Sequence, residues 1–403
     1  MNRLREKVLI IGAGRTGRGM LGEMFFRDGY YELVFADYNM SLVDELKTQG
    51  YYDVKKTNLS SGESSTTRVT PFKVYHTIRD RKEYLDAIVE AKIVLTAVFP
   101  DAFEQVAIDL ADGINLRAKS GNNSPILILL GSNYVGHHEA FFPIIWDRLS
   151  EKARDYYDHR VSLVGINANR KVTNGDQNLN GKLSLFGDDK KILQVDNKIH
   201  HKDIYLPEFI KLVENLDSLM AEKIWSANLE HCAFGFLGAF YGYETINQAV
   251  MNARVKSLAY YAWKESRRAL QIKFGFPIPS LEVKQKEYQN FTNLYFHDKI
   301  SRIARDPIRK LSRRDRFIGP ALLCLECDIM PYFILKCAAY GFFYDNSADQ
   351  SSQLLQSIIA KEGLEQAIVK VCQLNLLDRN DKIVFDLILS NSIEISKRDP
   401  FDV

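Results

Sequence analysis

The 403-residue chain lacks the features that mark several protein classes. Its five cysteines are few and odd in number, so a disulfide framework is not expected. Its formal net charge is only +2, which argues against a nucleic-acid or membrane-surface role for the chain as a whole. The uncharged stretch at residues 232–243 is too short to cross a bilayer. We therefore expect a globular protein without nucleic-acid or membrane partners, either a monomer or a small homo-oligomer.

Two further absences concern location and metals. The N-terminal residues lead directly into a strand-like run, without a long apolar segment and a small-residue cleavage site, which predicts a reducing, cytoplasmic location. Cys324 and Cys327 form a lone CxxC pair, and no second pair or nearby histidines complete a zinc site. We interpret them as buried thiols on an apolar helix and expect no bound metal.

What the first half contains is an alternation of strand-like and helix-like segments. Unbroken apolar runs, typical of strands buried on both faces, occur at 7–11, 32–37, 92–98, 125–130 and 161–166. Helical patterns between them, including one at 137–155, favour a parallel sheet. Further strand-like pieces are expected near 51–57 and 67–76, separated by a Ser/Gly-rich loop at 58–65. The turn residues at 175–205 are typical of a hairpin or excursion.

Beyond Tyr205 the pattern is almost entirely helical. Val255, Leu258, Ala259 and Ala262, for example, have the spacing of one helix face. The chain is about twice the length of a typical domain, which favours two domains. The predicted fold class is α/β, with a Rossmann-type doubly wound parallel sheet in residues 1–200 and a mostly α-helical domain in residues 201–403.

The strongest local signal is the run Gly12-Ala13-Gly14-Arg15-Thr16-Gly17, directly after the first strand-like segment. Gly12 permits a sharp turn, Gly14 lets a pyrophosphate approach the backbone, and Gly17 lets the next helix pack against the sheet. The free N–H groups at the start of that helix favour phosphate. We predict a dinucleotide site that also includes Arg15 and Thr16.

The ends of three strand-like runs add to this site. Asp37 ends the second run, where a carboxylate binds the adenosine ribose hydroxyls and repels a 2′-phosphate. NAD is therefore favoured over NADP, although Arg18 or Lys47 could complicate this preference. Ligands of doubly wound sheets bind beyond the carboxyl ends of strands, which makes Thr96 and Asn133 candidates for cofactor contact. Asn133 is also a candidate on the substrate side, and the alternative for it is an ordinary polar turn.

Three segments together resemble the polyol-specific long-chain dehydrogenases, the mannitol dehydrogenase family. Lys223 to His231 fits the pattern KxxxxNxxH, and residues 11–23 resemble the N-terminal fingerprint of the family. Residues 306–326 resemble the RKLxxxDRxxxP segment of its mannitol-1-phosphate 5-dehydrogenase subgroup. The resemblance implies NAD-dependent hydride transfer between a polyol and its ketose, in a cleft between two domains.

The resemblance also implies roles for three residues of the second half. Lys223 would be the general base in alcohol oxidation and the acid in ketose reduction. Asn228 would stabilise the developing alkoxide, and His231 would hold the reacting oxygen or a neighbouring hydroxyl. On a regular α-helix Asn228 and His231 lie about 140° and 80° from Lys223, and the axial span is about 12 Å. A bend and the long lysine side chain would then have to close the gap.

A basic segment at 302–316 departs from the balanced charge of the rest. A sugar phosphate would need one or two guanidinium groups, and Arg309 and Arg316, within the family-like segment, are the first candidates. The alternative is a solvated helix face. The family resemblance favours mannitol 1-phosphate and fructose 6-phosphate as the substrate pair.

Two departures from the family pattern keep other functions open. Ser132 stands where relatives place an acidic residue, and Asn169-Arg170 replaces Asp-Arg. A hexuronate reductase of the same family, acting on fructuronate or tagaturonate, is one alternative, and reduction rates with the three ketoses would distinguish it. A non-catalytic NAD-binding sensor is another. It would bind NAD without turning over any polyol, and the intact Lys223, Asn228 and His231 argue against it.

Overall fold

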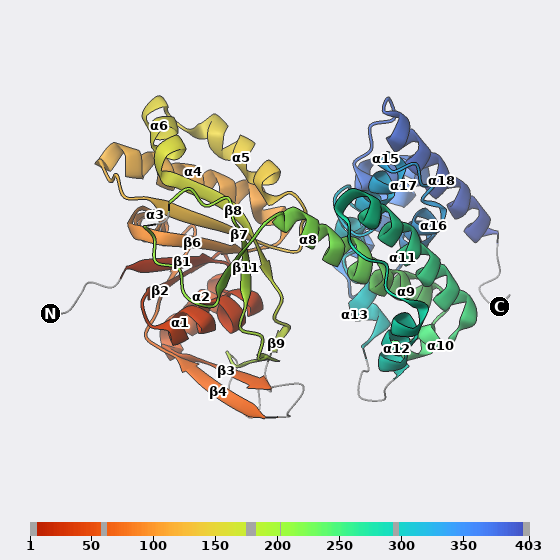
Figure 1. Ribbon diagram of the computed structural model, residues 1–403, viewed down its shortest axis with the longest axis horizontal. Coiled ribbons are helices and arrows are strands. Elements are labelled where there is room, and N and C mark those ends of the chain that lie inside the picture. The colour runs from red at the N-terminus through yellow and green to blue at the C-terminus, as the bar shows by residue number, and fades with distance from the viewer. Residues whose placement is uncertain (1–5, 58–62, 175–182, 202, 293–297, 398–403) are drawn as a thin grey trace. The chain divides into compact units, whose positions relative to one another are not determined.

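The computed structural model describes residues 6–57, 63–174, 183–201, 203–292 and 298–397, the side chains of 290–292 excepted. The chain divides into two compact units, Met1–Asp217 and Ser218–Val403 (Figure 1). The first unit contains two sheets with helices, and the second is helical in its described residues. This confirms the predicted fold class.

An eight-stranded sheet forms the centre of the first unit, in the order β12-β11-β8-β7-β6-β1-β2-β5. Its strands are β1 (Lys7–Ile11), β2 (Glu32–Asp37), β5 (Lys73–His76), β6 (Ala91–Ala97), β7 (Ile126–Gly131), β8 (Val161–Ala168), β11 (Leu193–Asp196) and β12 (Ile210–Val213). All neighbouring pairs are parallel except β8 with β11. Because β1 lies between β2 and β6, the chain reverses its direction of travel across the sheet at β1, where doubly wound folds bind ligands.

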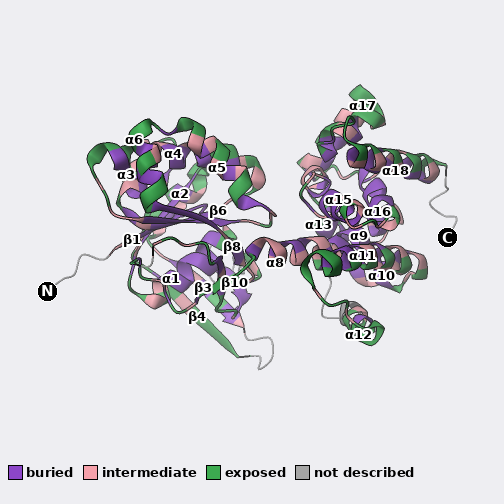
Figure 2. Ribbon diagram, turned by 45° about the horizontal axis from the view of Figure 1, so that its top comes forward, coloured by how far each residue is buried: buried purple, intermediate pink, exposed green. Residues whose placement is uncertain are grey.

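Alternating residues of the strands enter two cores, one on each face of this sheet. The helices of the first unit are η1 (Gly17–Gly22), α1 (Glu23–Asp28), α2 (Met40–Gln49), α3 (Arg81–Glu90), η2 (Pro100–Ala102), α4 (Phe103–Ser120), α5 (His137–Arg148) and α6 (Glu151–Arg160). Val8 and Ile10 of β1 pack with η1, α1 and α2. Leu9 and Ile11 pack with α3 to α6. The strands are therefore buried on both faces, as Figure 2 shows, which explains their unbroken apolar runs.

A smaller sheet lies against the η1 side, with strand order β4-β3-β10-β9. Its strands are β3 (Tyr52–Thr57), β4 (Ser64–Val69), β9 (Val172–Asn174) and β10 (Leu185–Asp188). The single strand expected at 67–76 is wrong, because β4 and β5 belong to different sheets. Pro71 lies between them and has no N–H to continue a ladder. Of the loop expected at 58–65, residues 58–62 lie outside the described residues, and Ser64 already belongs to β4.

Other expectations also differ from the structure. The helix expected at 137–155 is two helices, because Ser150 interrupts it and caps α6 by accepting the Ala153 N–H. Helix α3 was not expected. The chain beyond Tyr205 is not entirely helical, since β12 joins the central sheet and the first unit extends to Asp217. Within the hairpin expected at 175–205, residues 175–182 lie outside the described part, and β10 and β11 join different sheets.

The second unit is built around one apolar helix. Its elements are α8 (Leu216–Glu222, beginning in the first unit), η3 (Lys223–Ala227), α9 (Asn228–Phe240), α10 (Ile246–Met251), α11 (Ala253–Phe274), α12 (Leu281–Thr292), α13 (Ile300–Ala304), α14 (Pro307–Lys310), α15 (Ile318–Glu326), α16 (Tyr332–Phe342), α17 (Gln350–Cys372) and α18 (Arg379–Ser396). Helix α9 packs against α10, α11, α13 and α16. A Cβ at Gly235 would lie 2.7 Å from Ile303, so glycine there is required for the close approach of α13.

Two negative findings apply to the described residues. No helix among them is long and apolar enough to cross a membrane. No group of three or more His, Cys, Asp or Glu side chains within the described ranges is arranged to hold a metal ion. All five cysteines are free thiols, and Cys324 is buried as expected. Cys327 is the C-cap residue of α15 and is partly exposed, so the expectation that both thiols of the CxxC pair are buried is wrong for Cys327.

A buried ionic network joins α1 to the smaller sheet and to the segment between β8 and β9. Arg170 donates to the Glu23 carboxylate at 2.8 Å and to the Gly19 carbonyl at 3.0 Å, and Lys56 donates to the same carboxylate. The side chains of Arg170 and Glu23 have no exposed surface. Burial alone would raise the pKa of Glu23, but the hydrogen bonds from Lys56 and Arg170 outweigh it and hold the pKa below its usual value. These partners account for Arg170, whereas nothing in the structure explains Asn169 in place of aspartate.

The first prediction concerns this network. Arg170→Leu should lower the free energy of unfolding by about 3 kcal/mol, because it leaves the Glu23 carboxylate buried with one partner fewer. Urea denaturation followed by circular dichroism measures the change. Arg68→Leu is the control, since Arg68 pairs with Asp53 at an exposed position and should cost much less. Equal losses in the two variants would contradict the assigned role of Arg170.

Candidate active site

The glycine-rich turn after β1 has the geometry expected of a phosphate-binding loop. Gly12 has φ of 100°, and a Cβ there would lie 2.5 Å from the Ala97 carbonyl oxygen. A Cβ at Gly17 would lie 1.9 Å from the Gly12 carbonyl oxygen, so only glycine allows the helix to start so close to the strand. Gly14 has no neighbouring atom within 4 Å of its Cβ position. Its backbone is thus open to a ligand.

The two other residues of the turn are accessible. Arg15 and Thr16 are exposed, and they form the start of the helix that continues as η1. The Thr16 hydroxyl makes no capping hydrogen bond, so it leaves the first N–H groups of the helix to other acceptors. These groups suit an anion at this position.

Asp37 lies at the carboxyl end of β2, next to the turn. Its carboxylate accepts hydrogen bonds from the N–H groups of Ala13, at 2.7 Å, and Asn39, at 2.9 Å. The carboxylate is thereby held beside the glycine turn with lone pairs remaining for ribose hydroxyls. Arg18 is buried and donates to the carbonyls of Ala13 and Leu183, whereas Lys47 pairs with Asp80 at 2.6 Å. Both cations that could have favoured a 2′-phosphate are therefore engaged elsewhere.

Thr96 and Asn133 occupy different environments near the carboxyl ends of β6 and β7. Thr96 is buried, and its hydroxyl accepts the Gly131 N–H at 3.0 Å, which joins the two strands. Asn133 is exposed in the segment between β7 and α5. Both remain predictions as cofactor-binding residues, with Thr96 acting through its backbone position and Asn133 through its amide.

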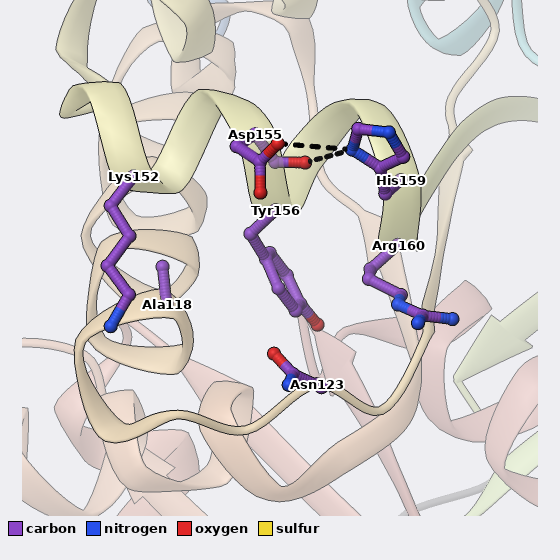
Figure 3. A pocket seen from close by; sticks show the side chains of 7 residues that line it. All are labelled: Ala118, Asn123, Lys152, Asp155, Tyr156, His159 and Arg160. Carbon is purple, nitrogen blue, oxygen red and sulfur yellow. Dashed lines mark hydrogen bonds and ion pairs between the residues drawn. The ribbon is translucent and has the colours of Figure 1, made fainter.

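A surface pocket of about 380 Å³ lies at the opposite edge of the central sheet. It is lined by Ala118, Asn123, Lys152, Asp155, Tyr156, His159 and Arg160, which are shown in Figure 3. Helix α4 ends and β7 begins on either side of Asn123, and α6 ends at Arg160. The pocket is therefore at the amino ends of the strands, away from the glycine turn, and helix C-termini do not favour anions. It is not part of the candidate site.

In the second unit, Lys223 and Asn228 are joined by a π-turn that the regular-helix expectation missed. Element η3 is a π-helix, and the Asn228 N–H donates to the Lys223 carbonyl, five residues back. A regular α-helix would instead separate the two side chains by about 140°. The i→i+5 turn is wider than an α-turn and brings Asn228 closer to the face of Lys223 than a regular helix would. The regular helix assumed from the sequence is therefore wrong between these two residues.

His231 follows one α-helical turn after Asn228 and is paired with a carboxylate that sequence reasoning missed. The His231 Nε2 lies 3.5 Å from an Asp298 carboxylate oxygen, and Arg302 binds the same carboxylate. Burial alone would raise the pKa of Asp298, but the hydrogen bonds from His231 and Arg302 hold it at about 2. Asp298 is therefore ionised and orients the His231 ring. No motif marks it, because the two residues are far apart in the sequence.

The basic segment 302–316 lies beside the same helix. The cations Lys310, Arg316 and Arg309 all act electrostatically on the buried thiol of Cys232, the residue after His231. Burial raises the pKa of this thiol, and burial also lowers the pKa of Lys310 to about 8. The KxxxxNxxH helix and the RKLxxxDR segment are therefore close together within one unit.

One buried carboxylate holds both predicted phosphate ligands. Asp315 binds Arg309 at 2.9 Å through one oxygen and Arg316 through the other, and Arg309 also binds Asp306. The guanidinium groups are fixed in place, which is how a site preorganises donors for an anion. The same pairing offsets part of their charge. The structure thus brings Arg309 and Arg316 together at Asp315, and phosphate binding by them stays a prediction.

The two glutamates beside the motif are held by structural partners. Glu222 pairs with Arg267 at 2.7 Å. Glu230 is buried and accepts hydrogen bonds from Lys284 and Tyr288 of α12. Burial raises the pKa of Glu230, although Lys284 opposes this shift. Both side chains therefore connect the segment of the motif to neighbouring helices, through an ion pair with α11 and hydrogen bonds with α12.

Comparison with known proteins identifies relatives along nearly the whole chain. Residues 6–204 match the mannitol dehydrogenase Rossmann domain, and residues 215–388 match the mannitol dehydrogenase C-terminal domain. A mannitol-1-phosphate 5-dehydrogenase of Buchnera aphidicola (subsp. Acyrthosiphon pisum, strain Tuc7) is 27% identical and is aligned over 96% of this chain and 98% of its own length. One from Oceanobacillus iheyensis is 29% identical over 89% of this chain and 92% of its own length.

Solved structures share the fold. Mannitol 2-dehydrogenase of Pseudomonas fluorescens, in a ternary complex with NAD and D-mannitol, superimposes with a TM-score of 0.73 at 11% identity, covering 98% of this chain and 92% of its own. A D-sorbitol dehydrogenase in substrate-free form superimposes with a TM-score of 0.60 at 14% identity, covering 98% and 95%.

Proposed function

The chain belongs to the mannitol dehydrogenase family, and we propose that it interconverts a phosphorylated polyol and its ketose with NAD. The leading substrate pair is mannitol 1-phosphate and fructose 6-phosphate, as the names of its relatives suggest. The observation that carries the proposal is the hydrogen bond from the Asn228 N–H to the Lys223 carbonyl, because it brings the residues with the amine and the amide closer to one helix face than an α-helix would.

Residues of the first unit fit a dinucleotide. The open backbone at Gly14 and the first N–H groups of the helix, which begins at Arg15, receive the pyrophosphate. The Asp37 carboxylate, fixed by Ala13 and Asn39, receives the adenosine ribose. NAD, when bound, takes up the hydride from the carbinol carbon in the oxidative direction.

Residues of the second unit transfer the proton of the substrate hydroxyl. The Lys223 amine accepts the proton of the substrate hydroxyl during oxidation and returns it to the carbonyl oxygen during reduction. The Asn228 amide donates to the same oxygen as negative charge develops on it. His231, oriented by Asp298, holds the reacting oxygen or an adjacent hydroxyl. Because amine and amide donors stabilise the alkoxide, the chemistry needs no metal.

The basic segment supports a phosphorylated substrate. Arg316 and Arg309 are held by Asp315 near the helix that carries the motif. A guanidinium recognises phosphate through two parallel hydrogen bonds, which distinguishes a sugar phosphate from a neutral polyol.

The proton-transfer role predicts the behaviour of Lys223→Ala. Turnover should fall by about 10³-fold or more, since general acid–base catalysis typically contributes that much, while NADH affinity stays unchanged. Steady-state kinetics and NADH fluorescence titration measure the two quantities. Lys264→Ala, at an exposed position of α11, is the control and should be fully active. Normal turnover in Lys223→Ala would contradict the assignment of Lys223 as the general acid and base.

The cofactor preference depends on the Asp37 carboxylate. Asp37→Ala should weaken NAD binding about tenfold and bring the kcat/KM values for NAD and NADP closer together, because charge-assisted hydrogen bonds and repulsion of the 2′-phosphate are both lost. Asp44→Ala, an exposed neighbour on α2, should leave the ratio as it is. An unchanged ratio in Asp37→Ala would show that another group sets the preference.

The substrate class is tested by following NADH absorbance with a panel of polyols, ketoses, their phosphates and hexuronates. We expect the highest kcat/KM for mannitol 1-phosphate and fructose 6-phosphate. Arg316→Gln should lower the preference for phosphorylated over unphosphorylated substrate about tenfold, by loss of a charge-assisted contact. Arg305→Gln, exposed in the same segment, is the control. Preference for fructuronate or tagaturonate would identify a hexuronate reductase instead.

A further inference from the structure

Ser132, in the segment between β7 and α5, forms a hydrogen bond with His137, and no part of the proposed chemistry uses this pair. The His137 Nε2 lies 2.9 Å from the Ser132 hydroxyl oxygen. The ring is 1% exposed and packs beside the aromatic rings of Phe103 and Tyr134. Its orientation is therefore fixed. Ser132 itself is only partly buried, and it directly follows the last residue of β7.

The other ring nitrogen of His137 determines where the ring proton lies. Among the described residues, no group forms a hydrogen bond with the His137 Nδ1, which is buried. Nδ1 faces the Cα of Gly165, whose Cβ position is 3.4 Å away. A buried N–H without an acceptor is rare and costly, so the proton belongs on Nε2. The Nε2–H then donates to the Ser132 hydroxyl oxygen.

The charge state of His137 agrees with this tautomer. Burial lowers the pKa of His137 to about 4, and a hydrogen bond with the Ser132 backbone opposes the shift only in part. His137 is also the first residue of α5, where the positive end of the helix disfavours an imidazolium. The ring is therefore neutral, with a single proton to donate.

The hydrogen bond from His137 therefore orients the Ser132 hydroxyl group. Because the Ser132 oxygen accepts from His137, its own hydrogen must point elsewhere, and no other described residue accepts it. Ser132 lies at the carboxyl end of β7, two strands from β1 in the order β7-β6-β1. Two strand spacings are about 10 Å. Asp37 lies on the opposite side of β1, so the adenosine half of a dinucleotide extends that way and the nicotinamide half extends toward Ser132.

We propose that the Ser132 hydroxyl, oriented by His137, donates a hydrogen bond to the carboxamide oxygen of the nicotinamide. The inference rests on the proposed NAD site. The carboxamide oxygen is the acceptor that a hydroxyl donor at this position requires, and the contact fixes the rotation of the nicotinamide ring. Ser132 is a binding residue, and His137 is a positioning residue.

The test compares two ligands that differ by the nicotinamide ring alone. NADH affinity is measured by fluorescence titration, and ADP-ribose affinity is measured by calorimetry on the same protein. Ser132→Ala should weaken NADH binding about fivefold and change ADP-ribose binding less than about twofold, as expected for one lost hydrogen bond. Retained ADP-ribose binding also shows that the variant is folded.

Variants of His137 distinguish its role as a hydrogen-bond donor that positions Ser132 from the packing of its ring. His137→Phe keeps the ring volume and removes the donor, and should weaken NADH binding as much as Ser132→Ala does. His137→Gln keeps an N–H donor and should retain the affinity. The double variant Ser132→Ala/His137→Phe should be no weaker than either single variant, because both remove the same contact.

Each remaining outcome contradicts the inference in a recognisable way. Unchanged NADH affinity in Ser132→Ala, or equal weakening of NADH and ADP-ribose, would overturn the proposed contact and leave the proposed function intact. Equal effects of His137→Phe and His137→Gln would overturn the positioning role. Failure of the unmodified chain to bind ADP-ribose would instead refute the NAD site, and the inference with it.

Discussion

The arrangement of the residues proposed to transfer the proton depends on one backbone hydrogen bond, from the Asn228 N–H to the Lys223 carbonyl. In an α-helix the Asn228 N–H would bond to the carbonyl of Ile224, and the two polar side chains would diverge. The wider π-turn brings residues five apart closer to one face, and in the α-helix that follows residues three apart are neighbours. The spacing of the motif is therefore one π-turn followed by one α-turn. The side chains of the motif supply the chemical groups, and the two backbone turns determine how these side chains are positioned along the helix.

A π-turn is uncommon and needs support from the surrounding fold. Trp225, inside the turn, donates its indole N–H to the Arg314 carbonyl at 3.2 Å, and its own carbonyl accepts the Ser266 hydroxyl. A Cβ at Gly319 would lie 2.6 Å from the Trp225 indole nitrogen, so the chain after the basic segment passes directly against the turn. The segment with Arg316 and the turn with Lys223 are therefore one packed arrangement, and a change in either would displace the other.

Local signals predicted the fold class and the main motifs well. Strands such as β7 are buried on both faces and have an unbroken apolar sequence, and the glycines after β1 meet steric demands that no other residue satisfies. Features that depend on distant partners were not predictable. Strand β12 has four residues and is a strand because β11 pairs with it, and β3 pairs with β10 across more than a hundred residues. The pairing of His231 with Asp298 leaves no trace in residue spacing, and the KxxxxN spacing alone does not distinguish a π-turn from a bent helix.

The two halves of the proposed chemistry are assembled within separate units. Gly14 and Asp37 lie in Met1–Asp217, whereas Lys223, Asn228 and Asp298 lie in Ser218–Val403. Each set is held by its own packed core, so its internal geometry does not require the other unit. Substitutions within one set share partners, as Arg309 and Arg316 share Asp315, and their effects should therefore be non-additive. Substitutions in different sets lie in different units, and we expect dinucleotide affinity and proton transfer to change independently of each other.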